Sequence, residues 1–184
     1  MKKIGCIKVI VLLCLISFTN STQMVAQHKA IETTGDIILF ALPATSLATT
    51  FIIGDTKGSW QFTKAFLLTE GLTYGLKFAV NKPRPFNNGD KAFPSGHTST
   101  VFQSAAFIHK RYGFKYSIPA YALAGFTAFS RIAAQKHDGW DVVAGAAIGI
   151  ASSYLFTTTY QRKHMQLTFN GQDGNYLLGF TYRF

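Results

Sequence analysis

Three short segments decide how this chain is organised: KFAVNKPRP (77–85), PSGH (94–97) and SRIAAQKHDGWD (130–141). The first segment predicts the end of a helix, because Pro83 and Pro85 push the residues before them out of the helical region. The second segment predicts the start of the next helix, with Ser95 as its N-cap. The charged and titratable residues of the three segments therefore lie on separate elements, which the fold must bring together.

The composition is typical of a membrane or membrane-surface protein. Apolar residues make up 48% of the 184 residues and charged residues only 14%, against a usual share of roughly a quarter. The net charge is +10 with only eight acidic residues, which suits a nucleic acid, an anionic lipid or a phosphorylated substrate. A nucleic-acid-binding domain normally clusters its Lys and Arg on one face. Here the cations stand singly among apolar runs, so we expect no nucleic-acid partner.

The first 26 residues predict a secretory signal. Lysines precede a short apolar run at residues 9–18, and Ala26 stands where cleavage would occur. An uncleaved first membrane segment is the alternative, although the apolar run is short for one. Both cysteines lie within this region. We therefore expect neither a disulfide nor a cysteine metal site in the body of the protein.

Residues 30–164 predict a helical domain. Its clearest apolar segment, residues 36–54, is just long enough to cross a bilayer. In the last segment, Gly145 and Gly149 are spaced for close contact between helices. The five segments of this domain are residues 36–54, 59–80, 95–108, 118–134 and 139–160. Counting the N-terminal run, we predict an all-α membrane helical bundle of about six apolar segments.

The basic turns between these segments predict an orientation in the membrane. If the N-terminus is inside, the turns at Lys57, at residues 110–115 and at residues 162–163 all lie on the cytoplasmic side, as the positive-inside tendency requires. The three segments quoted first then lie on the outer side. We expect a bacterial inner-membrane protein with its site facing the periplasm. The alternative locations are the periplasm and the outer membrane.

The last twenty residues, 165–184, have a different pattern. Apolar and polar residues alternate on both sides of the sequence GQDGN at 171–175, which predicts a β-hairpin. The aromatic alternation ending in Phe184 also resembles the closing strand of an outer-membrane barrel, but two strands cannot close a barrel. Such a strand conflicts with a cytoplasmic tail, and the sequence leaves the role of this hairpin-like tail open.

Five residues of the three segments suit a phosphate group. Arg84 and Arg131 offer planar forks that donate paired hydrogen bonds to phosphate oxygens, and Lys77 adds a point charge. Ser95 and Gly96 lie at the expected start of a helix, where backbone N–H groups and the helix dipole favour an anion. We expect these five residues to bind the phosphate.

Two histidines and a carboxylate supply reactive groups. His137 and Asp141 are four residues apart, so on a helix they would share a face. Asp141 can then accept a hydrogen bond from one ring nitrogen and leave the other nitrogen free to attack phosphorus. His97 is left to protonate the departing oxygen. We expect these three residues to be catalytic.

Ordinary structural explanations exist for each of these residues taken alone. A single cation near a helix end commonly reaches the membrane interface, PSGH can be a simple turn and cap, and a His–Asp pair can be a solvated helix pair. Glu70 shares a helix face with Lys77, as a structural partner or, in a membrane, as a functional candidate. His109 and His164 lie in basic turns and are expected at the surface. The occurrence of all three segments on one side of the membrane favours phosphate chemistry.

The pattern Lys77-x6-Arg84-Pro85, Pro94-Ser95-Gly96-His97 and Ser130-Arg131-x5-His137-x3-Asp141 resembles the signature of the type 2 phosphatidic acid phosphatase family. Its superfamily includes bacterial class A acid phosphatases and vanadium haloperoxidases, and the resemblance covers residues 36–160. It implies a helical bundle, His137 as the nucleophile that forms a phosphohistidine, Asp141 as its orienting partner and His97 as the general acid. It also implies no metal and no other cofactor. The phosphate-binding residues that it implies are Lys77, Arg84, Ser95, Gly96 and Arg131.

The resemblance to the lipid-phosphatase branch implies hydrolysis of a lipid phosphate monoester or pyrophosphate at the periplasmic face, with membrane lipids as further partners. Phosphatidic acid, phosphatidylglycerol phosphate, an isoprenoid pyrophosphate and lipid A phosphate are the candidate substrates. Only eight residues separate Pro85 from Pro94, fewer than is common in the family, which leaves the substrate open. The alternatives are a soluble exported acid phosphatase, a vanadate-dependent haloperoxidase, a phosphotransferase and a non-enzymatic membrane protein. The sequence leaves the oligomeric state open.

Overall fold

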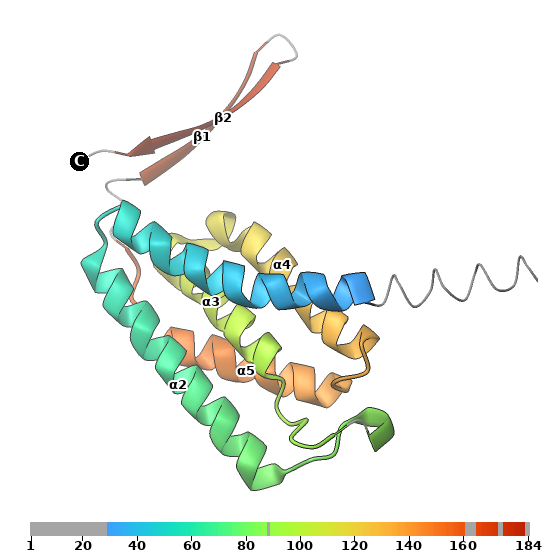
Figure 1. The fold of residues 1–184 in the computed structure, drawn as a ribbon. Helices are drawn as coiled ribbons and strands as arrows, with labels where there is room; N and C mark the ends of the chain where they lie inside the picture. The colour runs from blue at the N-terminus through green and yellow to red at the C-terminus, as the bar shows by residue number, and fades with distance from the viewer. Residues whose placement is uncertain (1–28, 88, 161–164, 173–174, 183–184) are drawn as a thin grey trace, which may run out of the picture.

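The computed structural model describes residues 29–87, 89–160, 165–172 and 175–182, which form a bundle of long helices followed by a β-hairpin (Figure 1). The expected signal or first membrane segment, residues 1–26, lies outside the described residues, as do Arg162 and Lys163. The elements are the N-terminal helix Lys29–Ile52, α2 (Thr56–Val80), η1 (Pro85–Asn87), α3 (Gly96–Tyr112), α4 (Phe114–Ala133), α5 (Gly139–Phe156), β1 (Met165–Gln172) and β2 (Asn175–Tyr182).

Local signals in the sequence determine where the helices begin and end. The Asp55 side chain caps α2 by accepting a hydrogen bond from Gly58 N at 2.9 Å. The same helix stops at Val80, two residues before Lys82-Pro83, and carries Lys77 in its last turn, as predicted. Ser95 is the N-cap of α3, also as predicted. Glycine at 113 separates α3 from α4 with a φ of 110°, a conformation that favours glycine.

Close packing of α3 against α5 brings two of the three signature segments together. A Cβ atom added to Gly145 would lie 2.5 Å from the Ser95 carbonyl oxygen, and one added to Gly149 would lie 2.2 Å from the Ser99 carbonyl oxygen. Only glycine permits this approach, which confirms the prediction that these two residues serve close helix contact. The backbone N–H of Ser95 also donates to the Asp141 carbonyl at 2.9 Å.

The N-terminal helix packs on α3 and α4 through a buried apolar cluster that includes Leu42, Val101 and Ala124. A second cluster of Phe62, Phe107 and Tyr112 joins α2 to the end of α3. Neither cluster reaches the start of α3, which leaves that end of the bundle for polar side chains.

Opposite ends of α2 carry different groups of charged residues. With 25 residues, the helix is about 37 Å long. Lys57 lies at its start, close to the end of α3 with Lys110, while Lys77 lies at its other end with the start of α3. The basic turns within the described residues are therefore at one end of the bundle, and the three signature segments are at the other.

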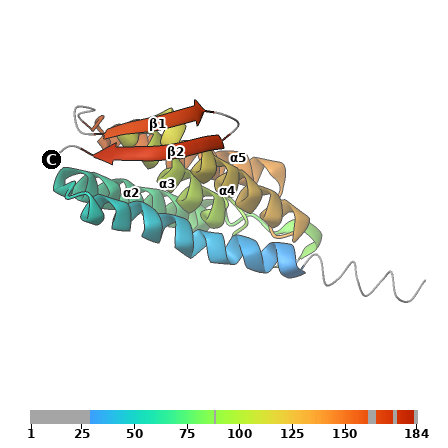
Figure 2. The ribbon, with the colours of Figure 1, turned by 90° about the horizontal axis from the view of Figure 1, so that it is seen from above.

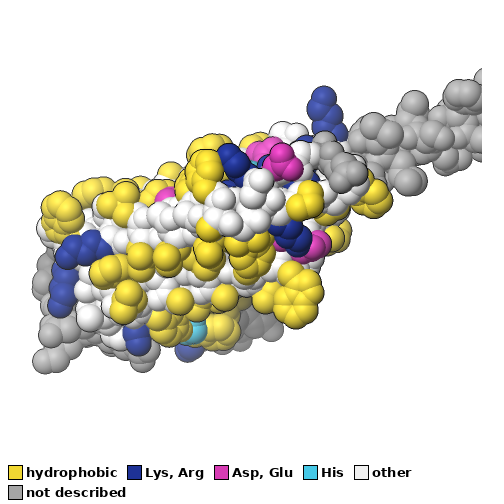
Figure 3. Space-filling model, turned by 90° about the horizontal axis from the view of Figure 1, so that it is seen from below, with side chains coloured by type: hydrophobic (Ala, Val, Ile, Leu, Met, Phe, Trp, Pro, Cys, Tyr) yellow, Lys and Arg dark blue, Asp and Glu magenta, His cyan; other side chains and the backbone are white. Residues whose placement is uncertain are grey.

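Many large apolar side chains are exposed. Figure 3 shows hydrophobic side chains spread over much of one face of the bundle. The most exposed of them, each at least 65% accessible, are Phe40, Phe51, Ile52, Trp60, Leu67, Phe78, Phe86, Trp140 and Leu155. By length and hydropathy, however, only the N-terminal helix and α5 qualify as membrane spans among the described residues. The other four predicted membrane segments are α2, α3 and α4, which are less apolar, and residues 9–18, which lie outside the described residues.

The strands β1 and β2 pair antiparallel, from Met165 opposite Tyr182 to Gln172 opposite Asn175. They lie beyond the end of the bundle at which α2 begins (Figures 1 and 2). The residues that alternate in the sequence of the tail are thus arranged as a hairpin, remote from the signature segments.

Candidate active site

A cleft of about 740 Å³ opens between the N-terminal helix and α2, at the end of the bundle where α3 begins. It brings together six of the eight predicted site residues: Lys77, Arg84, Gly96, His97, Arg131 and His137. The other two, Ser95 and Asp141, are fully buried behind the lining residues. The three signature segments therefore meet at one cleft.

The three predicted phosphate-binding cations differ in how they are held. Lys77 Nζ donates to the Lys91 carbonyl at 2.8 Å. Arg131 is almost fully buried and is held by hydrogen bonds from three of its nitrogens. Arg84 Nε is buried and has no hydrogen-bond partner in the described part of the chain. A buried guanidinium N–H without a partner is costly, so Arg84 is suited to receive an anion.

The turn before α3 leaves its backbone open to the cleft. The Ser95 hydroxyl caps α3 and accepts a hydrogen bond from Thr98 Oγ1 at 3.0 Å. Next to it, a Cβ on Gly96 would meet Lys77 and Thr73 only at 3.7 Å, an ordinary contact. Packing therefore does not require glycine at 96, whereas close approach of a ligand to the backbone would.

His137 and Asp141 lie close together, as predicted, but the structure shows neither the shared helix face nor the hydrogen bond that the sequence predicted. His137 precedes α5 rather than lying on it, because Asp138 is the N-cap and starts the helix after it. Asp141 is the third helical residue and closes a capping box with Asp138. The two side chains still meet, with His137 Nδ1 3.6 Å from Asp141 Oδ2. A turn and a cap, not a shared helix face, bring them together.

The His137 ring is buried and predominantly neutral at neutral pH. Burial lowers the pKa of His137, the charges of Lys77 and Arg84 lower it further, and Asp141 only partly opposes them, giving about 4 against an ordinary 6.5. No group within the described ranges forms a hydrogen bond with Nδ1. A neutral imidazole keeps a lone pair for attack on phosphorus, so the cations that would bind a phosphate also keep His137 nucleophilic.

Lys82 is a member of the site that the sequence did not single out. Its Nζ donates to Asp138 Oδ2 and, at 2.8 Å, to Asp141 Oδ1. Burial lowers the pKa of Lys82, but its hydrogen bonds to the two carboxylates outweigh burial and leave the pKa above its ordinary value. Lys82 thus holds the carboxylate that faces His137. Its position one residue before Pro83 gave no signal of this role.

Asp36 is the second residue that the sequence did not assign to the site. It comes from the N-terminal helix, and its Oδ1 lies 2.9 Å from His97 Nε2 and accepts from Arg131 Nη1 at 2.8 Å. The signal that could have drawn attention to it is an acidic residue at the edge of a long apolar run.

Glu70 lies in the cleft, whereas His109 lies outside it. Glu70 lines the cleft and accepts a hydrogen bond from Thr100 Oγ1 at 2.6 Å, as a structural partner would. His109, expected at the surface, is half-buried among Phe114, Tyr121 and Tyr154 because α4 and α5 pack around the end of α3. Across the described ranges, no group of three His, Cys, Asp or Glu side chains is arranged to hold a metal ion.

Comparisons with known proteins agree with one another. A family model described as the PAP2 superfamily matches residues 58–165. The lipid A 4′-phosphatase of Helicobacter pylori strain J99 is 32% identical over 170 residues, covering 83% of this chain and 85% of that protein. A lipid A 1-phosphatase of Porphyromonas gingivalis is 38% identical over 86 residues, covering 45% of this chain and 19% of that protein.

Among solved structures, the crystal structure of Aquifex aeolicus LpxE has a similar fold. The TM-score is 0.62 at 23% sequence identity, and the match covers 71% of this chain and 84% of that chain. At this identity the likeness concerns the fold alone. It extends the similarity from the signature to the arrangement of the helices.

Proposed function

Because the chain belongs to the PAP2 superfamily, we propose that it is a membrane phosphatase that hydrolyses a phosphate monoester of a lipid A-type lipid at the periplasmic face. The observation that carries this proposal is the composition of the cleft. The three predicted phosphate-binding cations and two histidines line it together with two further lysines, Lys91 and Lys136, and four carboxylates, Glu32, Asp36, Glu70 and Asp90. The cleft also has apolar side chains, those of Leu39, Phe40, Pro43, Phe66 and Tyr74. A phosphate and a lipid chain can therefore be bound side by side.

Phosphate transfer to the enzyme is the first step of the proposed reaction. Lys77, Arg84 and Arg131 offset the charge of the phosphate oxygens. His137 Nε2 attacks phosphorus with its lone pair, the phosphorus–oxygen bond to the lipid breaks, and His97 gives its proton to the departing oxygen. Asp141 stabilises the positive charge that develops on the His137 ring.

Hydrolysis of the phosphohistidine is the second step. A water molecule attacks phosphorus, the bond to His137 breaks, and His97, now neutral, takes a proton from the water. Inorganic phosphate leaves, and both histidines return to their starting protonation states. His97 thus acts as the acid in the first step and as the base in the second.

The apolar part of the cleft supports a lipid rather than a small soluble ester. Leu39, Phe40 and Pro43 of the N-terminal helix face Phe66 and Tyr74 of α2 across it. These side chains would contact an acyl chain whose phosphate lies against the cations. Among lipids, the relative similar over most of both chains is named a 4′-phosphatase, and we therefore propose the 4′-phosphate as the one removed.

The proposed membrane topology follows from the two ends of the bundle. The exposed apolar side chains on the helices would face lipid, with Lys57, Lys110 and Lys115 on the cytoplasmic side. The cleft then opens to the periplasm. On this proposal the five described helices span the membrane, and the segment at residues 9–18 is either a signal or a sixth span.

Phosphate release from a panel of substrates tests the proposal. The panel holds bisphosphorylated lipid A, phosphatidic acid and a soluble aryl phosphate, with the purified full chain in detergent. We expect lipid A to lose its 4′-phosphate, as mass spectrometry of the product would show, and to be hydrolysed more efficiently than the soluble ester. His137→Ala should release none, while His109→Gln, which changes a histidine outside the cleft, should retain activity. A preference for the soluble ester, or undiminished release by His137→Ala, would contradict the proposal.

A further inference from the structure

The N-terminal helix supplies an acidic side chain to the cleft from outside the family signature. Asp36 precedes residues 58–165, the part of the chain that the family model matches. Its side chain is 47% exposed and lines the cleft, yet one oxygen, Oδ1, contacts both His97 Nε2 and Arg131 Nη1. A single carboxylate oxygen therefore joins the proposed general acid to one of the proposed phosphate-binding cations.

Close approach of the helix backbone makes this contact specific. Arg131 Nη2 donates to the Glu32 carbonyl at 2.7 Å, one turn before Asp36. A Cβ atom on Gly35 would lie 2.1 Å from Ser130 Oγ and 3.0 Å from Arg131 Nη2. A Cβ at 35 would displace the Ser130 side chain, so glycine favours this close contact of the helix with α4 where Asp36 meets Arg131.

The hydrogen bonds of Arg131 leave part of its guanidinium available. A guanidinium has five N–H donors. Nε donates to Ser130 Oγ at 3.1 Å, Nη1 to Asp36 and Nη2 to the Glu32 carbonyl. One donor remains on each terminal nitrogen, and Arg131 lines the cleft. The N-terminal helix therefore orients the guanidinium plane and leaves two donors for a bound anion.

Like His137, His97 has a carboxylate beside one ring nitrogen, and the contact is shorter, 2.9 Å to Asp36 against 3.6 Å between His137 and Asp141. Asp36 faces Nε2 of His97, which leaves Nδ1 for a departing oxygen. A carboxylate on one ring nitrogen holds the orientation of an imidazole and stabilises its protonated form. The acid form that leaving-group protonation requires thus depends on Asp36.

From this geometry we propose that Asp36 is a positioning residue for leaving-group protonation: it orients and charges His97 and, through the same oxygen, holds Arg131. The N-terminal helix is then part of the active site and not only a membrane span. This inference rests on the proposed function, in which His97 is the general acid.

Dependence on the leaving group tests the role of Asp36. Asp36→Asn keeps the size of the side chain but removes its charge, and Asp36→Glu restores the charge. The matched control is Glu32→Gln, which removes a carboxylate one turn earlier whose side chain pairs with Lys136 at 3.7 Å and keeps the carbonyl that holds Arg131. Each purified full-length variant is assayed on an alkyl phosphate, which needs protonation of its leaving group, and on an aryl phosphate, which needs it less.

The expected result is a selective loss. General acid catalysis typically contributes 10²- to 10⁴-fold. Since kcat/KM reports the step in which the leaving group departs, Asp36→Asn should lower kcat/KM for the alkyl phosphate about 100-fold and for the aryl phosphate less than about fivefold. Asp36→Glu should recover much of the alkyl activity, and any effect of Glu32→Gln, whose carboxylate lines the cleft but does not contact His97, should be the same on the two substrates. An equal loss on both substrates, or no loss on either, would overturn the proposal.

Binding of orthovanadate, a phosphate mimic, tests the same residue without turnover. Removing a negative charge would by itself tighten anion binding. Loss of the group that holds Arg131 should instead weaken it, and we expect Asp36→Ala to bind vanadate about fivefold more weakly in a thermal-shift titration. Equal or tighter binding would contradict the role in holding Arg131. If the wild type releases no phosphate from any substrate, the proposed function fails, and this titration still decides whether Asp36 positions Arg131.

Discussion

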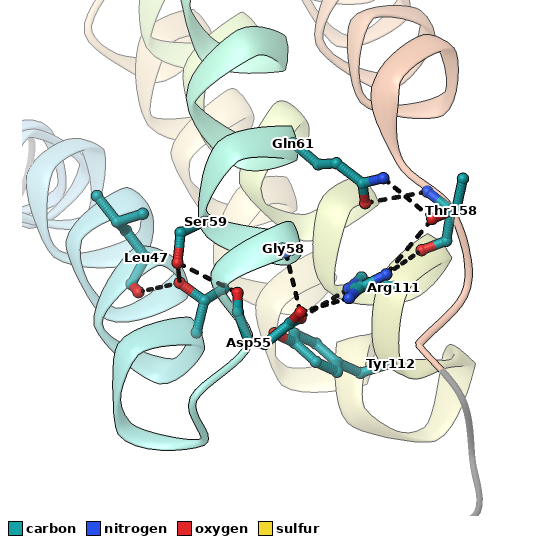
Figure 4. A network of polar contacts seen from close by, with 9 residues as sticks. Leu47, Asp55, Gly58, Ser59, Gln61, Arg111, Tyr112 and Thr158 are labelled. Carbon is teal, nitrogen blue, oxygen red and sulfur yellow. Dashed lines mark hydrogen bonds and ion pairs between the residues drawn. The ribbon is translucent and has the colours of Figure 1, made fainter.

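Arginine side chains lie at both ends of α2, but Arg84 at the cleft end leaves its buried Nε without a hydrogen bond, whereas Arg111 at the Asp55 end does not. At the Asp55 end, Arg111 Nε donates to Asp55 Oδ2 at 2.7 Å and Nη2 donates to Oδ1. Tyr112 and the Gly58 N–H also donate to this carboxylate, and Arg111 Nη1 reaches the Thr158 carbonyl at 2.9 Å (Figure 4). The side chains of Asp55 and Arg111 are 2% and 4% exposed, so the pair is closed to ligands.

At the cleft end, two buried nitrogen atoms lack a hydrogen-bond partner among the described residues. The Nε of Arg84 and the Nδ1 of His137 are buried, and neither forms a hydrogen bond with any residue that the structure describes. Buried polar groups are nearly always hydrogen-bonded, and exceptions commonly mark a functional role. The contrast teaches that burial of charge alone does not identify a site here. A buried charge stabilises the fold where its partners are complete, and it marks the cleft where they are not.

The largest expected effect is on stability at the closed end. Arg111→Met leaves the Asp55 carboxylate buried without its cation, so the free energy of unfolding should fall by about 3–5 kcal/mol. The phosphate release of the molecules that remain folded should not change, because the cleft lies at the other end of α2. Chemical denaturation together with specific activity would measure both. Loss of activity in fully folded Arg111→Met would contradict the separation of the two ends.

Arg84→Met should have the opposite pattern. Removing one preorganised donor to the transition state commonly costs about 10²- to 10³-fold in rate, and we expect a loss of that size in kcat/KM for phosphate release. The free energy of unfolding should stay the same or rise, since a buried N–H without a partner is removed. The same two measurements, applied to this variant, would reveal whether Arg84 is instead structural, in which case stability would fall.

Lys82→Met should have a smaller effect, about tenfold on kcat, because Lys82 acts through the carboxylates of Asp138 and Asp141 and not on the phosphate. Without the lysine, the carboxylate is freer to interact with His137, which should raise the pKa of His137. The acid limb of the pH–rate profile should therefore move to higher pH. A lower kcat with an unmoved acid limb would mean that Lys82 does not act on the His137–Asp141 pair.

The smallest expected effect is on the pH dependence of the wild type. With the pKa of His137 at about 4, kcat/KM should fall less than about 1.5-fold from pH 6.5 to 5.5, where a histidine of ordinary pKa would cause about a fivefold loss.

The lowered pKa of His137 also affects the stability of the fold. Between pH 6.5 and 4 the unfolded chain binds a proton that the folded chain does not, so stability should decrease as pH falls through this window. His137→Ala should remove that part of the decrease in a pH series of denaturation curves.

Residues near sequence-marked boundaries were the predictable part of the site. Pro83 places the end of α2, and therefore Lys77 and Arg84. Ser95 starts α3, with Gly96 and His97 after it. These placements follow from local rules for capping and proline. The Gly145 contact also followed from spacing alone.

Contacts between distant segments could not be predicted in the same way. Arg111 was expected among the cations of a cytoplasmic turn, but it is buried against Asp55, 56 residues earlier in the chain. Asp36 reaches His97 only because the N-terminal helix packs against α4 at Gly35. Such pairings depend on which helix faces lie together, and neither periodicity nor composition determines this. The structure therefore shows what the sequence could not predict, namely which residues pair with each buried charge.

The central claim, that the open end of the bundle transfers phosphate through His137, is tested most directly by trapping the intermediate. The full chain is mixed with a labelled phosphate ester, quenched in alkali to preserve phosphohistidine, digested and mapped by mass spectrometry. We predict phosphate on His137 in the wild type and more of it in His97→Ala, in which hydrolysis of the intermediate lacks its base. Phosphate release without label on His137, or label on another residue, would contradict the claim.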